Sequence, residues 1–417
     1  MELKKYKLAD IADFNKSSIS KSETFKEIIY LDTSSITENV VSGTVIMNTK
    51  EAPSRAQRKV TNNTIIYSTV RPRLKHYGIL SLPQNNFIVS TGFTTIDIKD
   101  LYKDKIDPRY LYLLLTQPTI TDYIGNIADT AVSAYPSINP SDLSSLCFMF
   151  PDHAIQKTIA DIWNNYDRKI ELNRAINQNL EAMAKQLYDY LFVQFDFPNE
   201  NGRPYKSSGG KMVWNEKLKR EIPKVWDISL IKDIATTYSG GTPKSTNIEY
   251  YNNGEIAWIN SGELNSPIIT KTTNYITKCG LENSSAKLYP SNSILVAMYG
   301  ATAGKVSLLT FEACSNQAVC GVIPTIENML YYVYFHISSL YSHFITISTG
   351  SARDNISQDT IKNILLPIPT KNILKLFDEK IGNIYQMIVN NYQQIDSLTK
   401  QRDELLPLLM NGQASVG

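Results

Sequence analysis

The sequence predicts an α+β protein made of two mixed, strand-rich domains, each followed by one long helix. Two observations support this prediction. The segment from Ile138 to Leu191 aligns with the segment from Ile356 to Leu409 at a constant shift of 218 residues and without a gap. In both segments a proline, Pro151 or Pro369, is followed by a long run with helical apolar spacing. We therefore interpret the chain as two copies of one module.

Length and composition fit two ordinary domains. A chain of 417 residues that is 42% hydrophobic can bury two cores. No apolar stretch approaches the ~20 residues needed to cross a bilayer, and no charged-then-apolar leader opens the chain, so we expect a cytoplasmic protein without a membrane contact. The cysteines are too sparse for a disulfide framework or a zinc site, and we expect reduced core thiols at Cys147, Cys279, Cys314 and Cys320.

The repeat divides the chain into five predicted segments. They are a first domain (1–151), a first long helix (152–198), a linker (199–222), a second domain (223–369) and a second long helix (370–412). Asp152 is the expected N-cap of the first helix. The linker is rich in Gly, Ser and alternating charge, but Tyr205, Met212 and Trp214 predict that it packs against other residues.

Within the domains, short apolar runs predict the secondary structure. In the first domain we expect strands at 64–67 and 78–80, a helix at 110–115 and a last buried run at 146–150. Related runs in the second domain predict a strand at 293–296 and a helix at 330–335.

Both long helices carry an apolar seam whose members are spaced alternately by four and three residues, which is a heptad pattern. Five heptads exceed the three or four that support a coiled coil, so we expect the helices to pair, antiparallel and with pseudo-twofold symmetry. The alternative is an amphipathic helix lying on its own domain. The seam asparagines argue against it, since such residues cost stability but fix register. The seams are Ile159, Trp163, Tyr166, Ile170, Asn173, Asn177, Leu180, Ala184, Leu187 and Leu191, and Phe377, Ile381, Ile384, Ile388, Asn391, Ile395, Leu398, Arg402, Leu405 and Leu409.

A helix of roughly 40 residues is about 60 Å long, far longer than either domain requires. We therefore expect the helix pair to act as a spacer. Two modules related by a pseudo-twofold axis match a DNA target read as two half-sites about one helical turn, ~34 Å, apart.

Residues 50 to 75 are strongly basic, with Glu51 as the single acid. A solvated surface loop is the ordinary explanation of such a run. This run is rich in arginine and interleaved with aromatic residues, and guanidinium groups fit phosphates and guanine edges. The segment is therefore a candidate nucleic-acid contact through Arg55, Arg58, Lys59, Arg71, Arg73 and Lys75.

Catalytic motifs are incomplete in this sequence. Asp107-Pro108-Arg109-Tyr110 is similar to the (D/N)PP(Y/F) loop of amino-methyltransferases, but Arg109 stands where the second proline belongs. Gly304-Lys305 lacks the first glycine and the Ser/Thr of a phosphate-binding loop. The four histidines have no metal-ligand spacing. We expect no catalytic residue, metal site or cofactor on this chain.

Several segments of the chain resemble the specificity subunit of type I restriction–modification systems. The resemblance covers essentially the whole chain, and the linker from Pro204 to Met212 is also typical of these subunits. The first domain departs from the pattern, with Phe14-Asn15-Lys16 and Arg71–Lys75 in place of two glycine-rich segments. The segments that carry the resemblance are Tyr238–Pro243, Ile256–Ile259, Gly262–Leu264, Met298–Lys305 and Ser315–Ala318.

The resemblance implies two target recognition domains, each followed by a long helix, with the helices paired as an antiparallel coiled coil. It implies a subunit that selects a bipartite double-stranded DNA sequence with a non-specific gap. Such a subunit docks two methylation subunits and, through them, restriction subunits. S-adenosylmethionine and ATP are then expected on those partners. The diverged domains predict an asymmetric target.

The second domain is expected to contact DNA through polar residues near glycines. Gly240, Gly241, Gly300 and Gly304 would allow a close approach of the backbone to DNA, or serve tight turns. The loops at 349–353 and 130–135 could touch DNA or a partner subunit. The predicted contacts are Thr242, Lys244, Tyr299, Thr302, Lys305, Ser351 and Arg353.

Three other functions stay open from the sequence. A specificity subunit of a two-part type II enzyme would share this architecture. A stand-alone methyltransferase or nuclease would need S-adenosylmethionine binding or DNA cleavage by the chain alone. A coiled-coil adaptor predicts no salt-dependent DNA binding.

Overall fold

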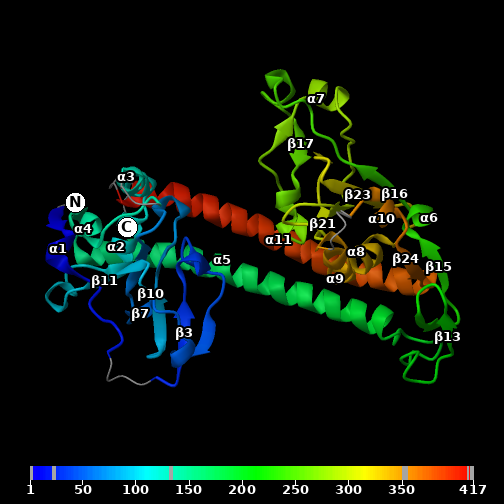
Figure 1. The fold of residues 1–417 in the computed structure, drawn as a ribbon, viewed down its shortest axis with the longest axis horizontal. Helices are drawn as coiled ribbons and strands as arrows, with labels where there is room; N and C mark the ends of the chain where they lie inside the picture. The colour runs from blue at the N-terminus through cyan, green and yellow to red at the C-terminus, as the bar shows by residue number, and fades with distance from the viewer. Residues whose placement is uncertain (1–2, 21–24, 131–134, 350–355, 411–412, 414–417) are drawn as a thin grey trace. The chain divides into compact units, whose positions relative to one another are not determined.

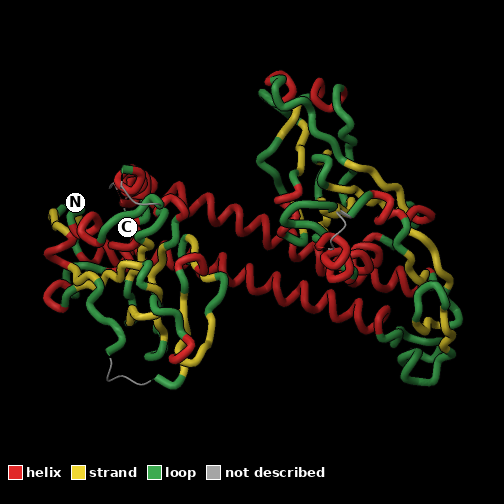
Figure 2. Tube along the Cα trace, in the orientation of Figure 1, coloured by secondary structure: helices red, strands yellow, loops and turns green. Residues whose placement is uncertain are grey.

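The computed structural model describes residues 3–20, 25–130, 135–349, 356–410 and 413. The chain forms two compact units, residues 1–168 with 399–417 and residues 169–398 (Figure 1). The division falls inside both long helices, so each unit consists of one globular part and a piece of each helix. Figure 2 shows that the globular parts mix strands and short helices, as the predicted α+β class requires.

The first unit is built around a four-stranded antiparallel sheet. Its strand order is β2 (Ala12–Phe14), β11 (Phe93–Ile98), β8 (Ile65–Ser68) and β9 (Tyr77–Ile79). The helix α2 (Pro108–Leu115) shares one hydrophobic core with this sheet, and α3 (Pro118–Asp129) follows it. The predicted strands at 64–67 and 78–80 and the predicted helix at 110–115 are confirmed by β8, β9 and α2.

A second sheet of the first unit mixes parallel and antiparallel pairs. Its order is β6 (Val45–Asn48), β3 (Glu27–Leu31), β10 (Phe87–Ser90) and β7 (Ala56–Lys59), with β3 and β10 parallel. Between β3 and β6 the chain makes a 3₁₀ turn, η1 (Thr33–Ser35), and a small hairpin of β4 (Ile36–Thr37) and β5 (Val40–Val41).

The second unit repeats this topology. Its first sheet runs β16 (Ala235–Ser239), β23 (Val319–Pro324), β20 (Ser293–Ala297), β21 (Val306–Leu309) and β18 (Ile268–Ile269). Its second sheet runs β19 (Tyr275–Ile276), β17 (Ile256–Ile259) and β22 (Cys314–Ser315), with β17 and β22 parallel. The strands β16, β23, β20 and β21 therefore correspond to β2, β11, β8 and β9, and β19, β17 and β22 correspond to β6, β3 and β10. In the described part of the chain the second unit adds β18 and has no counterpart of β7.

The helices of the second unit also correspond in part to those of the first. The helix α8 (Leu330–Ser339) follows the first sheet as α2 does, and α9 (Tyr341–Thr349) comes after it. The short α7 (Lys278–Glu282) lies between β19 and β20. The strand predicted at 293–296 and the helix predicted at 330–335 are confirmed by β20 and α8.

Each module begins and ends with the same pair of strands. In the first unit β1 (Lys4–Lys7) pairs antiparallel with β12 (Cys147–Phe150), and α1 (Leu8–Ile11) and α4 (Pro140–Ser144) flank them. In the second unit β15 (Asp227–Leu230) pairs with β24 (Leu365–Ile368), flanked by α6 (Ile231–Ile234) and α10 (Gln358–Lys362). The register is the same in both. The constant shift of 218 residues thus corresponds to one conserved piece of structure at each domain exit.

The long helices lie within the segments predicted for them. The first, α5 (His153–Tyr188), continues into a π-helical turn, η5 (Asp189–Val193), and the second, α11, covers Lys371–Met410. After η5 the backbone of Phe195 has φ 64°, a left-handed conformation that a helix does not contain. The division of the chain into five segments at the predicted boundaries stays a prediction.

The linker contains a hairpin of β13 (Met212–Asn215) and β14 (Arg220–Pro223). The ring of Tyr205 stacks on that of Phe197 with centroids 4.6 Å apart, and Met212 packs against the core of the second unit. The linker therefore packs against other residues as predicted, through Tyr205 and Met212, whereas Trp214 is 57% exposed. The expectation of core thiols is right for Cys314 and Cys320 and wrong for Cys147 and Cys279, which are exposed.

Candidate nucleic-acid interface

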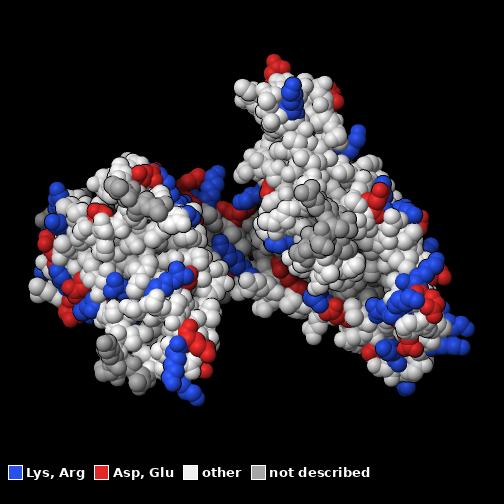
Figure 3. Space-filling view, in the orientation of Figure 1, with Lys and Arg blue, Asp and Glu red and all other residues white. Residues whose placement is uncertain are grey.

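The basic segment of the first unit divides between two places. Arg58 and Lys59 lie on β7, whereas Arg73 lies in a 3₁₀ turn, η3 (Pro72–Leu74), inside the loop that joins β8 to β9. We call this loop, residues 69–76, loop A, and the corresponding loop between β20 and β21, residues 298–305, loop B. On the face drawn in Figure 3, each unit carries basic and acidic side chains close together. Charge alone therefore does not define the interface, and the contacts of each residue have to be considered.

Loop A holds two basic residues in an unusual backbone conformation. Arg71 has φ 50° and Lys75 has φ 56°, so both lie in the left-handed region that long side chains rarely adopt. Pro72 between them is buried and begins the turn, and the guanidinium carbon of Arg71 lies 4.8 Å from the centre of the Tyr135 ring. A strained backbone persists only where the surrounding structure holds it, and residues of this kind cluster at binding sites. This geometry supports Arg71 as a DNA contact.

Arg73 is held by α3 instead. Its guanidinium lies 3.0 Å from a carboxylate oxygen of Asp129 and 3.5 Å from one of Asp122, and it donates a 2.7 Å hydrogen bond to Asn126. A side chain at Gly125 would lie 2.8 Å from the guanidinium carbon. Arg73 therefore anchors loop A to α3. Asp122, Asn126 and Asp129 recur at helical spacing in the sequence, and this acidic face could have been recognised before the structure was known.

The predicted contacts of the first unit that lie outside loop A also have interactions within the protein. Arg55 forms a 3.0 Å ion pair with Asp32, and Arg58 donates a 3.3 Å hydrogen bond to Ser18. Lys59 lines a hollow of about 470 Å³ together with Lys16 and other residues that follow β2, β7 and β11. These three residues stay predicted contacts, and they lie on strand β7 or next to it rather than in loop A.

Loop B has a different chemistry. Gly300 and Gly304 have φ 86° and 80°, so glycine is needed at both positions for the turn itself. Thr302 is 4% exposed and its hydroxyl donates a 2.9 Å hydrogen bond to the carbonyl of Ser261. Its role is to hold the loop, and this geometry does not favour the predicted DNA contact through Thr302.

Tyr299 and Lys305 are the predicted contacts of loop B that reach the surface in part. The Tyr299 hydroxyl can donate a hydrogen bond at neutral pH, as an ordinary tyrosine does, and burial raises its pKa further. The amine of Lys305 donates a 2.5 Å hydrogen bond to the side-chain oxygen of Asn265. Val306 follows Lys305 directly as the first residue of β21, so Lys305 stands at the end of loop B.

The glycines after β16 are required by packing within the unit. A side chain at Gly240 would lie 2.0 Å from the carbonyl oxygen of Asn316, and one at Gly241 would lie 2.3 Å from the backbone nitrogen of Ala286. Thr242 hydrogen-bonds Gln317, and Lys244 is exposed. Packing therefore explains Gly240 and Gly241 without a ligand.

Two predicted contacts, Ser351 and Arg353, lie outside the described residues, as does the segment 131–134 of the corresponding loop. They stay predictions.

Of the predicted DNA contacts that the structure describes, loop A brings together Arg71, Arg73 and Lys75, and loop B brings together Tyr299, Thr302 and Lys305. Arg55, Arg58 and Lys59 gather around β7, and Thr242 and Lys244 follow β16.

In the first unit the beginning of α5 lies against the end of α11. Ile159, Trp163 and Leu409 belong to one hydrophobic core, and Arg402 forms a 2.6 Å ion pair with Asp167. The pair is antiparallel here, since higher-numbered residues of α5 face lower-numbered residues of α11.

In the second unit the end of α5 lies against the beginning of α11 in the same antiparallel sense. The amide of Asn391 donates a 2.8 Å hydrogen bond to Asn177, and Asn173 donates a 3.2 Å hydrogen bond to Gln394. The predicted seam is buried or half-buried throughout, at Ile159, Trp163, Tyr166, Ile170, Asn173, Leu180, Leu187, Leu191, Phe377, Ile381, Ile384, Ile388, Asn391, Ile395, Leu398, Leu405 and Leu409.

The Asp107-Pro108-Arg109 motif has a structural role. Asp107 is 3% exposed, accepts a 2.8 Å hydrogen bond from the backbone nitrogen of Arg109 at the start of α2, and pairs with the Arg109 guanidinium at 2.7 Å. Arg109 also pairs with Asp161 of α5. These contacts hold α2 against α5. Both carboxylate oxygens of Asp107 are bound by Arg109, so Asp107 has no free oxygen with which to bind a DNA base. In the described residues, no group of His, Cys, Asp or Glu side chains is arranged to hold a metal ion.

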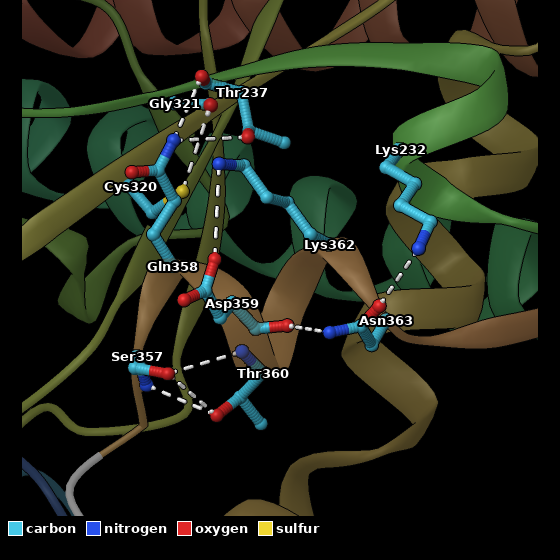
Figure 4. Close-up of polar contacts among 10 residues, drawn as sticks. All are labelled: Lys232, Thr237, Cys320, Gly321, Ser357, Gln358, Asp359, Thr360, Lys362 and Asn363. Carbon is cyan, nitrogen blue, oxygen red and sulfur yellow. Dashed lines mark hydrogen bonds and ion pairs between the residues drawn. The ribbon is translucent and has the colours of Figure 1, made fainter.

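The domain exit of the second unit is fixed by polar contacts around α10 (Figure 4). Gln358 donates hydrogen bonds of 2.8 Å and 3.0 Å to the carbonyl and hydroxyl of Thr237 on β16. Lys232 of α6 donates a 3.3 Å hydrogen bond to Asn363 at the other end of α10. Ser357 and Thr360 form a capping box, as Asn139 and Asp142 do at α4 of the first unit. Both exits therefore begin with a capped helical turn.

Among the helices of the described residues, none is both long and apolar enough to cross a membrane. The family model for the type I restriction modification DNA specificity domain matches residues 1–182 and 223–405. The two matches coincide with the two modules, and together they cover most of the chain. The chain belongs to this family, and as a specificity subunit it is a non-catalytic component of a type I system.

Individual relatives agree with this assignment. The chain is 27% identical to the type I restriction enzyme HindI specificity subunit of Haemophilus influenzae, over 98% of this chain and 99% of that protein. It is 25% identical to the MjaIX specificity subunit of Methanocaldococcus jannaschii, over 87% and 83%. The crystal structure of a type I specificity subunit from M. genitalium covers 98% of this chain and 96% of its own, with a TM-score of 0.59 and 16% identity, and it shares the fold. These relatives favour a type I system over the type II alternative.

Proposed function

We propose that this chain reads an asymmetric DNA target made of two different half-sites separated by a non-specific gap. The observation that carries the proposal is the pair of corresponding loops. Loops A and B join equivalent strands of two sheets with the same topology, but one presents Arg71 and Lys75 and the other presents Tyr299 and Lys305. Equal frameworks with different loop chemistry are what two unlike half-sites require.

Within loop A, Arg71 is the residue best suited to read a base. An arginine can donate two hydrogen bonds to O6 and N7 of guanine in the major groove, and such a pair contributes about 1–3 kcal/mol of discrimination. The guanidinium of Arg73 is bound by Asp129, Asp122 and Asn126, so Arg73 anchors the loop. Lysines more commonly hold phosphates, which position the protein without specifying sequence.

The experiment is a binding selection from randomised duplexes with the purified chain, alone and with its partner subunits. Arg71→Ala is expected to relax selectivity in one half-site and to leave the other unchanged. Arg73→Ala is the matched variant, and it is expected to reduce thermal stability together with affinity. A uniform loss of affinity across all sequences for Arg71→Ala would make Arg71 a phosphate contact instead.

Salt dependence separates this function from that of a structural adaptor. Each phosphate contact is expected to lower log K by roughly 0.9 per unit of log salt. Binding that is weak and independent of salt at all sequences would overturn the proposal of a DNA-reading subunit.

We propose that the chain docks two methylation subunits and, through them, restriction subunits. S-adenosylmethionine and ATP would then be bound by those partners, in a cytoplasmic complex. On α5, Leu172, Ile176 and Met183 are 54%, 43% and 56% exposed and lie at steps of four and seven residues, which places them on one face of the helix. An exposed apolar stripe of this kind supports assembly with another subunit. Leu172→Glu with Met183→Glu is expected to abolish co-purification with a methylation subunit, whereas Tyr123→Glu, also exposed, is not.

The helix pair is proposed to set the gap between half-sites. Seven residues inserted in each helix, beside the facing pair Asn177 and Asn391, would add about 10 Å of helix. This corresponds to about three base pairs, and the preferred gap should lengthen by that amount. An unchanged gap in a complex that still methylates DNA would contradict the spacer role.

A further inference from the structure

We propose that Glu38 in the first unit and Asn265 in the second are specificity-positioning residues, each of which fixes its reading loop by holding the lysine near the loop's end. The inference rests on the proposed function, since it assumes that loops A and B read the two half-sites. The carboxylate of Glu38 lies 2.5 Å from the amine of Lys75, and the side-chain oxygen of Asn265 lies 2.5 Å from the amine of Lys305.

The two contacts occupy corresponding places in the two units. Lys75 and Lys305 come at the ends of loops A and B, just before the return strands β9 and β21. Glu38 and Asn265 come from the segments that follow β3 and β17, which are corresponding strands of the second sheets. The same lysine-to-oxygen contact therefore bridges the same two segments in both modules, although the acceptor is an acid in one and an amide in the other.

In the first unit Glu38 is placed by a tight hairpin turn. Glu38 and Asn39 have φ 46° and 67° and join β4 to β5, as the two central residues of such a turn require. The turn is tied to loop A and β9, because the backbone nitrogens of Glu38 and Asn39 donate 2.9 Å hydrogen bonds to the carbonyls of Lys75 and Tyr77. A side chain at Gly78 would lie 2.5 Å from the Ile36 methyl group and 2.9 Å from the Asn39 side-chain oxygen, so glycine at this position of β9 leaves room for the turn.

Backbone strain gathers at this contact. In the described chain four long charged residues have positive φ, and three of them, Glu38, Arg71 and Lys75, lie at or beside this contact, the fourth being Lys219 of the β13–β14 turn. Most of the other non-glycine residues with positive φ are asparagines, which tolerate this conformation. Glu38 and Lys75 are each about half exposed, and exposed ion pairs contribute little to stability. Stability is therefore a weak explanation for a strained pair, and the positioning of loop A is a better one.

In the second unit the acceptor is equally fixed. The amide nitrogen of Asn265, at the end of the 3₁₀ turn η7 (Ser261–Asn265), donates a 2.8 Å hydrogen bond to the carbonyl of Gly262, which turns its oxygen toward Lys305. Thr302 adds a second tie from loop B to the same turn through the carbonyl of Ser261.

The difference in charge between the acceptors has a measurable consequence. Glu38 compensates the charge of Lys75, whereas Asn265 leaves Lys305 with its full positive charge. Glu38→Gln keeps an acceptor oxygen and removes a negative charge, so it should preserve selectivity, tighten binding and steepen the salt dependence by up to about 0.9 in slope. Asn265→Asp adds a negative charge, so it should preserve selectivity, weaken binding and make the salt dependence less steep by up to about 0.9 in slope.

The test uses the full chain in a duplex selection, with binding measured at several salt concentrations. Glu38→Ala and Asn265→Ala remove the acceptor and should each relax discrimination roughly fivefold to a hundredfold in one half-site, a different one for each variant. Glu216→Ala and Glu216→Gln are matched controls, because Glu216 forms an exposed ion pair with Lys219 at the β13–β14 turn of the linker and belongs to neither loop. They should not change selectivity.

The inference is overturned if Glu38→Ala and Asn265→Ala leave selectivity unchanged, or if both lower binding equally at all sequences. If the alanine variants do not fold, Glu38→Gln and Asn265→Asp provide the test. Preserved selectivity with a steeper salt slope for Glu38→Gln and a shallower one for Asn265→Asp supports the inference, and unchanged slopes overturn it. Failure of the proposed function gives a different result, because the unmodified chain would then enrich no bipartite sequence at all.

Discussion

The side-chain amide of Asn391 on α11 donates a 2.8 Å hydrogen bond to the side-chain oxygen of Asn177 on α5, inside the second unit. Asn177 is 3% exposed, and its own amide nitrogen lies 3.4 Å from the carbonyl of Ile388. The pair interrupts a seam that is otherwise mostly apolar. A shift of one heptad would place an asparagine opposite an aliphatic residue, so the pair favours one register of the two helices.

We predict that Asn391→Ala destabilises the second unit by about 1–3 kcal/mol, because it leaves the buried oxygen of Asn177 without its donor. Replacing both residues by leucine should restore or raise stability, since two apolar side chains leave no polar atom unpaired. Urea denaturation of the single and double variants measures both effects. A single variant as stable as the parent would show that the hydrogen bond contributes nothing.

Asp107 is expected to be essential for folding of the first unit rather than for chemistry. Asp107→Ala removes a cap of α2 and a buried partner of Arg109, so we predict a loss of about 2 kcal/mol. Asp104→Ala is the matched control, because Asp104 lies nearby in sequence and is exposed. Equal stability of the two variants in denaturant would contradict the structural role.

The long helices and the domain exits could be predicted from the sequence for physical reasons. A heptad seam is a periodic pattern of apolar side chains along one helix. The pattern can be recognised without knowing which distant residues the helix contacts. The exit strands β12 and β24 and the capped turns α4 and α10 keep a constant shift of 218 residues, because both copies retain the same register against β1 and β15. The shared topology of the globular parts was harder to see, since it survives in strand order while most of the sequence match is lost.

The candidate interface could be predicted only as a segment. Arg71 and Arg73 are two residues apart and look alike in the sequence, yet Arg73 is bound by α3 and Arg71 lies over Tyr135. Their different roles come from partners about fifty or more residues away in the chain. Glu38 was missed for the same reason, because it is 37 residues from Lys75 and stands in a region that is not basic. The burial of Thr302 could not be predicted either, because burial of a single hydroxyl leaves no periodic signal in the sequence.

The stability of the second unit should fall in mildly acidic solution because of His336. Its ring nitrogens face the Tyr188 hydroxyl at 3.4 Å and the Leu365 carbonyl at 3.3 Å, and burial lowers the pKa of the imidazole from 6.5 to about 4. Between these two pH values the unfolded chain binds a proton that the folded unit does not. Stability is therefore full above pH 6.5 and is lost as the pH falls toward 4, by up to about 3 kcal/mol.

The variant His336→Gln isolates this contribution, because it keeps a polar side chain near Leu365 and removes the titrating group. Between pH 6.5 and 4 the denaturation midpoint of the variant should depend less on pH than that of the parent. Above pH 7 the two midpoints should have the same pH dependence. Parallel pH profiles of the two proteins would show that His336 is not responsible.

Gly240 should tolerate no side chain, whereas Gly262 should. An alanine at Gly240 would place its methyl carbon 2.0 Å from the Asn316 carbonyl oxygen and 2.4 Å from the Ser315 hydroxyl, and no flexible side chain can move away to relieve the backbone contact. We predict that Gly240→Ala destabilises the second unit by about 1–3 kcal/mol, as overpacking of a well-packed site does. At Gly262 no described atom lies within 4 Å of such a carbon, so Gly262→Ala should be neutral or slightly stabilising. Thermal unfolding of the two variants measures the difference. If Gly240→Ala is as stable as Gly262→Ala, the chain after β16 does not pack against residues 315–316 in solution, and a close approach of its backbone to DNA would again explain the glycine.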